Sequence, residues 1–127
     1  MSTYQGVVTV SRIAGSAISP YRFVVLAAGD SKYDHVAGAQ GDLDGISAEG
    51  GVGDGDVFPM VIPNGAIVKV EAGAAVSVGD TVASDASGRA ITAVSGAGNF
   101  TGGKALTAAG AAGELIEIQF IKDRDQA

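Results

Sequence analysis

The sequence contains no cysteine, no tryptophan and only one histidine among its 127 residues. Without cysteine the chain has no disulfide, no thiolate zinc site and no thiol nucleophile. A single histidine, His35, excludes the paired histidines of the common zinc hydrolases, and a Ser-His-Asp arrangement would have to be built around it. Because His35 lies in a polar segment with no nucleophile-elbow sequence nearby, we expect it to be a surface residue.

Positive charge is also scarce, with 8 Lys and Arg against 14 Asp and Glu and a formal net charge of −6. The basic residues are scattered singly, so no stripe of them could replace phosphate counterions, and nucleic-acid binding is disfavoured. The start MSTYQGVVTV lacks the basic residues and the long apolar run of a signal peptide. Apolar runs reach only about five residues, far fewer than a membrane span needs. We expect neither a membrane nor a nucleic-acid partner.

Glycine is abundant at 20 residues, whereas only 6% of the residues are aromatic. Each interior glycine costs a helix about 1 kcal/mol against alanine, so long helices are disfavoured. No repeat of solenoid length and no linker divides the chain. The length predicts a single domain over residues 1–127, with an N-terminal arm (1–12), a β domain (13–121) and a C-terminal tail (122–127).

Short stretches of period-two alternation, bounded by Gly, Pro, Asn or Asp, predict an all-β fold. The clearest is ELIEIQFIK, which places Ile116, Ile118 and Phe120 on one face. GVVTVSRI and RFVVLAA predict two more strands, the second of them central because it is apolar on both faces. KALT predicts a further short strand. We expect a small compact β-barrel or β-tulip-like domain with long glycine-rich loops.

Asn64 and Gly65 separate the apolar runs VFPMVI and AIVKV. Both residues tolerate the positive φ of a type I′ turn, so the two runs are predicted to pair as an antiparallel hairpin. Between Asp30 and Asp56 the alternation disappears, and the segment is predicted to be a long excursion with one brief strand or turn.

The acidic, glycine-rich segment from Asp42 to Asp56 invites a calcium hypothesis. Asp42-Leu43-Asp44-Gly45 lacks a third ligand position before its glycine and has no Glu closing a twelve-residue loop. GGVGDGDVF has Gly55 where the calcium nonapeptide carries Asp. A solvated loop is therefore predicted, and we expect no metal and no cofactor.

The stretch VSVGDTVASDASGRAI crowds polar side chains around two glycines. A nucleophilic Ser84 or Ser87 would need a nearby base, and only carboxylates are available, so no catalytic residue is predicted. Asp can accept hydrogen bonds from backbone N–H groups, and Gly can take positive φ, which favours two turns. The residues predicted to form turns are Asn64, Gly65, Gly79, Asp80, Asp85 and Gly88.

AIVKVEAGAAVSVGDTVASDASGRAITAV followed by GGKALTAAGAAGELIEIQFI resembles the small capsid cement or decoration proteins of tailed bacteriophages. In that family VGD-V-SD-SGRA, a variable loop, G-AL-AA-AGE and a final amphipathic strand occur in this order. AISPYRFVVLAAGD and GVGDGDVFPMVIPNGAIVKV also suit the pattern. The resemblance implies a non-enzymatic β-rich protein on the exterior of the phage capsid. It also implies a homotrimer at three-fold and quasi-three-fold positions that bridges subunits of the major capsid protein.

In such proteins the N-terminal arm commonly grips the capsid, and here the leading strand has no obvious hairpin partner. We expect this arm to lie across the capsid and to add a strand to a capsid sheet. Its candidate residues are Tyr4, Val7, Val8, Thr9 and Val10. Because large aromatics are scarce and tend to anchor contacts, Tyr21 and Phe58 are candidates for subunit contacts.

Two alternatives stay open. The same composition suits another virion component, such as a head fibre base or a tail part. A small β-clip or carbohydrate-binding module is the second alternative, although sugar binding would favour an aromatic platform and the aromatic residues here are dispersed.

Overall fold

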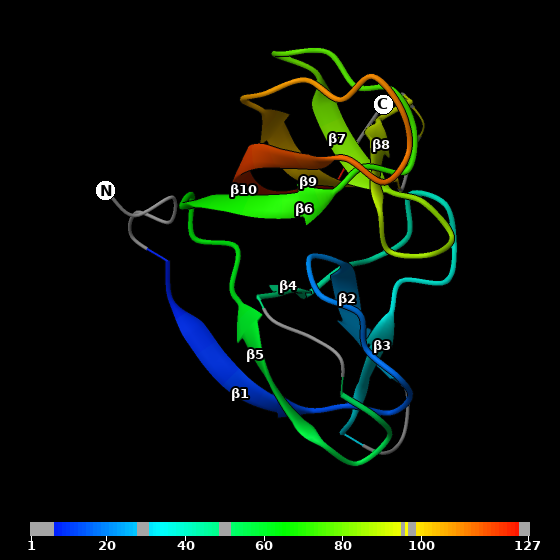
Figure 1. Ribbon diagram of the computed structural model, residues 1–127, viewed down its shortest axis with the longest axis vertical. Helices are drawn as coiled ribbons and strands as arrows, with labels where there is room; N and C mark the ends of the chain where they lie inside the picture. The colour runs from blue at the N-terminus through cyan, green and yellow to red at the C-terminus, as the bar shows by residue number, and fades with distance from the viewer. Residues whose placement is uncertain (1–6, 28–30, 49–51, 95, 97–98, 125–127) are drawn as a thin grey trace.

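The computed structural model describes residues 7–27, 31–48, 52–94, 96 and 99–124. These residues form ten strands and no helix (Figure 1). The strands make two antiparallel five-stranded sheets, which confirms the all-β fold but replaces the expected barrel with a compact sandwich-like arrangement. The strands are β1 (Thr9–Ile13), β2 (Phe23–Leu26), β3 (Tyr33–His35), β4 (Gly45–Ser47), β5 (Val57–Val61), β6 (Ile67–Glu71), β7 (Thr81–Ser84), β8 (Ala90–Thr92), β9 (Phe100–Ala105) and β10 (Leu115–Arg124).

The two sheets have the same topology. The strand order is β1-β5-β4-β2-β3 in one sheet and β6-β10-β9-β7-β8 in the other, so each strand of the first sheet has a counterpart five strands later. We call β1 to β5 the first half and β6 to β10 the second half; they are the lower and upper parts of Figure 1. The chain therefore builds one five-stranded unit twice.

Individual contacts repeat as well. An isolated parallel bridge joins Ala14 to Tyr33 in the first half and Ala72 to Ala90 in the second. In each half this single bridge joins the end of one edge strand to the other edge strand, so each sheet is curled without closing into a barrel. The Ala14 N–H donates to the Asp56 carbonyl, and its counterpart Ala72 donates to Glu114, both at 2.8 Å. Further counterparts by register are Ile18 and Val76, Tyr21 and Gly79, Phe23 and Thr81, Val24 and Val82, Val57 and Leu115, Phe58 and Ile116, Met60 and Ile118, and Ile62 and Phe120.

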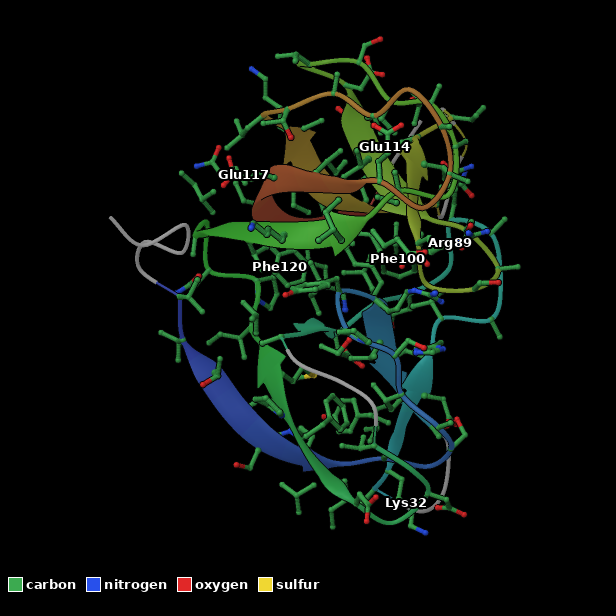
Figure 2. The ribbon with its side chains drawn as sticks, in the orientation of Figure 1. Lys32, Arg89, Phe100, Glu114, Glu117 and Phe120 are labelled. Carbon is green, nitrogen blue, oxygen red and sulfur yellow. The ribbon has the colours of Figure 1, made fainter. Side chains whose placement is uncertain are left out.

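Equivalent positions fill the interior of each half. A small cluster inside the first half contains Ile18, Val24 and Phe58. The corresponding residues of the second half belong to a larger cluster that continues across the boundary between the halves. At that boundary the rings of Phe23 and Phe120 lie 6.0 Å apart and tilted by 54°, and Figure 2 shows Phe120 facing the first half. Three of the fully buried side chains are phenylalanines, Phe23, Phe58 and Phe120.

The predicted hairpin across Asn64 and Gly65 is wrong, because β5 and β6 lie in different sheets. A type I′ turn needs positive φ at both central residues, and here only Gly65 has it, at 84°. The Gly65 N–H donates to the Phe120 carbonyl at 2.8 Å, and the Asn64 side chain accepts from the Ala66 N–H at 3.2 Å. The turn thus carries the chain from the first half to the second.

The segment between Asp30 and Asp56 is not the expected excursion, since it supplies β3 and β4. All three residues of β4 are buried, and β4 lies between β5 and β2. A Cβ at Gly45 would lie 2.7 Å from the Val61 carbonyl oxygen, so the strand packs where only glycine fits. Strands of three residues are too short to show alternation in the sequence. Similarly, β9 begins at Phe100, ahead of the run KALT that predicted it.

Candidate interaction surface

The N-terminal strand has a partner inside the protein. Thr9 and Val10 pair with Val61 and Met60 of β5, so the leading strand, which has no hairpin partner, already belongs to a sheet of the protein itself. The pairing was missed because β5 is distant in sequence and no hairpin joins it to β1. Tyr4 lies outside the described residues.

On its other side β1 is an edge strand, because the described part of the chain places no strand there. The Ala14 N–H donates to Asp56 and the Ile62 N–H donates to the Val8 carbonyl, which fixes the even-numbered residues of β1 as those bonded to β5. In an antiparallel pair the residues between them direct their backbone groups away. These residues are Thr9, Ser11 and Ile13. A backbone edge of this kind is a template for another chain.

Apolar side chains accompany this edge. Val8 is 46% exposed, and Ile13, which is 44% exposed, lies opposite the exposed Val57. Val7, by contrast, is partly buried against the large core cluster. Of the predicted arm residues, Val8 and Thr9 therefore offer the most surface to a partner. Ile13 and Val57 were missed by sequence reasoning, because in a strand pattern they read as ordinary core residues.

The two halves meet through a polar contact as well as through the core. The Glu71 N–H donates to the Tyr21 carbonyl at 2.8 Å, and the Arg22 guanidinium donates to the Glu71 carboxylate at 3.3 Å. Arg89, labelled at the boundary in Figure 2, lies 3.8 Å from the same carboxylate. The Tyr21 side chain is half-buried, and the residue takes part in this contact through its backbone carbonyl.

Phe58 is fully buried among the residues of the first half's own core. Its neighbours there include Ile18, Val24 and Met60. A side chain with no exposed surface cannot touch another subunit, so Phe58 is removed from the contact candidates. Alternation in β5 explains this position, since Phe58 and Met60 point inward together.

Gly79 and Asp80 form a turn before β7. Gly79 has a φ of 90°. The Asp80 carboxylate accepts hydrogen bonds from the Ser77 N–H and from the Thr92 hydroxyl, both at 3.0 Å. The carboxylate is thus occupied by the protein's own turn.

Asp85 and Gly88 form the turn between β7 and β8. The Asp85 carboxylate accepts from the N–H groups of Ser87 at 2.8 Å and Arg89 at 2.9 Å, and Gly88 has a φ of 80°. A Cβ on Gly88 would lie 2.6 Å from the Phe23 carbonyl oxygen, which belongs to the other half. This turn therefore also shapes the contact between the halves.

His35 is half-buried rather than on the surface as expected. Its Nε2 accepts a hydrogen bond from the Ser19 N–H at 3.0 Å. Burial, together with the nearby positive charge of Arg22, lowers the pKa of His35 below 6.5. The imidazole is therefore a neutral hydrogen-bond acceptor that holds the loop before β2.

The acidic segment is tied to the second half. Lys122 donates to Asp42 at 2.7 Å and lies 3.5 Å from Asp44 and 5.4 Å from the centre of the Phe100 ring. Burial opposes the charge on Lys122, but the hydrogen bond and charges of the two carboxylates outweigh it and raise its pKa. Among the described residues no three His, Asp or Glu side chains are grouped to hold a metal ion. The described chain also has no helix long and apolar enough to cross a membrane.

These contacts define a β-sheet protein whose polar side chains shape turns and join two repeated halves, and in which β1 presents an exposed strand edge. The chain belongs to the phage cement protein family, whose model matches residues 1–120. It is thus a structural protein of the phage virion. The resemblance seen in the sequence is confirmed.

Similar folds among solved structures include a chain described as the head fiber gp8.5 N base in bacteriophage phi29. The match has a TM-score of 0.73 and 23% sequence identity, and it covers 95% of this chain and 98% of the other. At this identity the likeness concerns the fold. A search of curated proteins found no matching relative.

Proposed function

We propose that this protein binds the outer surface of a phage capsid and stabilises the shell by bridging subunits of the major capsid protein. The match of the cement family to nearly the whole chain carries this proposal. The role is non-enzymatic. Many copies, each adding a modest contact across a capsomer boundary, stabilise a shell through multivalency without any single tight site.

The proposed assembly is a homotrimer at the three-fold and quasi-three-fold positions of the capsid exterior. The formal charge of −6 suits a protein that stays soluble before assembly and does not meet the packaged DNA. Tyr21 remains a candidate near the subunit contacts, because its loop lies beside the contact between the halves.

The capsid contact is proposed to involve Tyr4 and residues 7–10. The exposed side chain of Val8 and the outward backbone groups of Thr9 support it. An extended capsid segment could pair with this edge, with backbone hydrogen bonds giving affinity and alternate side chains giving specificity. Removing residues 2–10 would take Thr9 and Val10 out of β1, so a smaller change is the better test.

Thr9→Pro deletes the outward N–H while leaving the bonds between β1 and β5 in place, and proline is tolerated at the first residue of a strand. We expect Thr9→Pro to lose co-sedimentation with heads of the phage that encodes the protein, whereas Thr9→Val, which keeps the N–H, retains it. Equal occupancy of the two variants, with both folded by circular dichroism, would exclude strand addition at this edge.

A head fibre base is the second candidate function, favoured by the structural likeness to the phi29 protein described above. Images of decorated heads separate the two functions. A fibre base would carry a projecting fibre at each site, whereas a cement protein would lie flat across the capsid subunits.

A further inference from the structure

The contact between the halves uses a different face of each half. Phe23 of the first half packs on Phe120 of the second. Their counterparts are Thr81 and Ile62, and a two-fold arrangement would place these two together in the same way. Instead Thr81 is exposed, and Ile62 packs against the first half's own core. The two halves are therefore joined head to tail.

A head-to-tail contact leaves one of each complementary face unpaired at the two ends. The loop that ends in Tyr21 in the first half corresponds to a loop that ends in Gly79 in the second half. Val78, in this second loop, is 65% exposed. On the first half, the counterpart of Glu71 is Ile13, exposed and with its backbone directed outward. The protein thus presents both partners of a contact that it already makes once internally.

We propose that these two faces bind each other in successive copies of the chain, so that the contact between subunits repeats the contact between halves. Ile13 on β1 of one copy then meets residues 78–81 of the next. The proposal rests on the self-association proposed above and supplies its surfaces, and it does not depend on capsid binding. A head-to-tail contact of this kind closes into a ring when its rotation allows.

The chemistry of the two contacts differs in a way that suits assembly from soluble subunits. Inside the chain, Arg22 faces Glu71 across the boundary. Between copies, Asp80 takes the position of Arg22, and the apolar Ile13 takes the position of Glu71. The Asp80 carboxylate is already engaged in its own turn. Inside the chain the Tyr21 carbonyl accepts a hydrogen bond from the Glu71 N–H. Between copies the Gly79 carbonyl of one copy accepts the equivalent hydrogen bond from the Ile13 N–H of the other. The subunit contact is therefore built on backbone and apolar groups without an ion pair.

The absence of cysteine makes a direct test possible, because a short bifunctional maleimide links only engineered thiols. The variants are Ile13→Cys, Thr81→Cys and, as a matched control, Leu115→Cys. Leu115 is 45% exposed, and its counterpart Val57 is exposed and outside the contact between the halves. Each variant is treated alone and in equimolar mixtures, and linked chains are counted on denaturing gels alongside light scattering of the untreated protein.

We expect the mixture of Ile13→Cys with Thr81→Cys to give linked dimers, and the doubly substituted chain to give linked species up to the size of the assembly. Single variants and the mixture with Leu115→Cys stay unlinked. An oligomer by light scattering without these links would overturn the proposed faces while leaving self-association standing, and so would efficient linking of Ile13→Cys to itself. A monomer by light scattering would overturn both the self-association and the proposed contact faces. Binding to phage heads is measured separately and does not depend on this result.

Discussion

Tyr21 and Gly79 occupy the same position in the two halves, and both have positive φ, 61° and 90° respectively. This conformation costs a non-glycine residue about 1 to 2 kcal/mol, so a tyrosine there shows that the unit requires the bend. In the first half the bend presents the Tyr21 carbonyl to the Glu71 N–H. The conformation therefore belongs to the repeated unit, and the contact between the halves uses it.

Two glycine substitutions separate backbone strain from steric conflict. Gly79→Ala meets no atom within 4 Å of the new Cβ and should lower the free energy of unfolding by about 1 kcal/mol through φ alone. Gly88→Ala should cost about 3 kcal/mol, because its Cβ also meets the Phe23 carbonyl oxygen at 2.6 Å. Urea unfolding of the two variants measures both values. Equal losses would show that the turn at Gly88 does not press on the first half.

The polar contact between the halves should contribute modestly to stability. Glu71→Ala removes the carboxylate acceptor of Arg22 and one of the carboxylates beside Arg89, and should lower the free energy of unfolding by about 1 kcal/mol. Glu117→Ala, on the outer face of the same sheet, should change it by less than about 0.5 kcal/mol. A loss at Glu117 as large as that at Glu71 would contradict a special role for the Glu71 carboxylate.

The sequence predicted the β class and the final strand because long alternating runs such as that of Ile116 to Phe120 survive in the structure. It missed the repeated unit. The paired stretches AGSAIS, from Ala14, and AGAAVS, from Ala72, are its clearest trace, and they are short and rich in common residues. The exposed β1 edge was also beyond the sequence, because strand order depends on contacts between distant segments.

Stability should depend on pH through His35. Its pKa in the folded protein lies below the ordinary value of 6.5, so between these two values the unfolded chain binds more protons. The free energy of unfolding should therefore fall as the pH drops below about 6.5, and stay unaffected by this group well above that value.

His35→Gln is the control, because the glutamine oxygen can accept the Ser19 N–H without titrating. Thermal unfolding across the same pH range should show a smaller slope for this variant. An unchanged slope would assign the dependence to other groups.

The oligomeric state should respond to one exposed position and not to another. Ile13→Asp places a carboxylate opposite Asp80 in the proposed subunit contact, and we expect it to dissociate the assembly to monomers. Leu115→Asp introduces the same charge at a similarly exposed position of the second half and should leave the assembly intact. Light scattering at equal protein concentrations compares them. Intact assembly in Ile13→Asp would remove this face from the interface.

The most direct test of the proposed function is a pair of electron-microscopy density maps of the phage heads, one with this protein and one without it. We predict extra density on the capsid exterior at three-fold and quasi-three-fold positions, spanning neighbouring major capsid protein subunits and fitted by the two five-stranded sheets. Maps that are identical on the outer surface would contradict the proposal that this protein is a capsid cement.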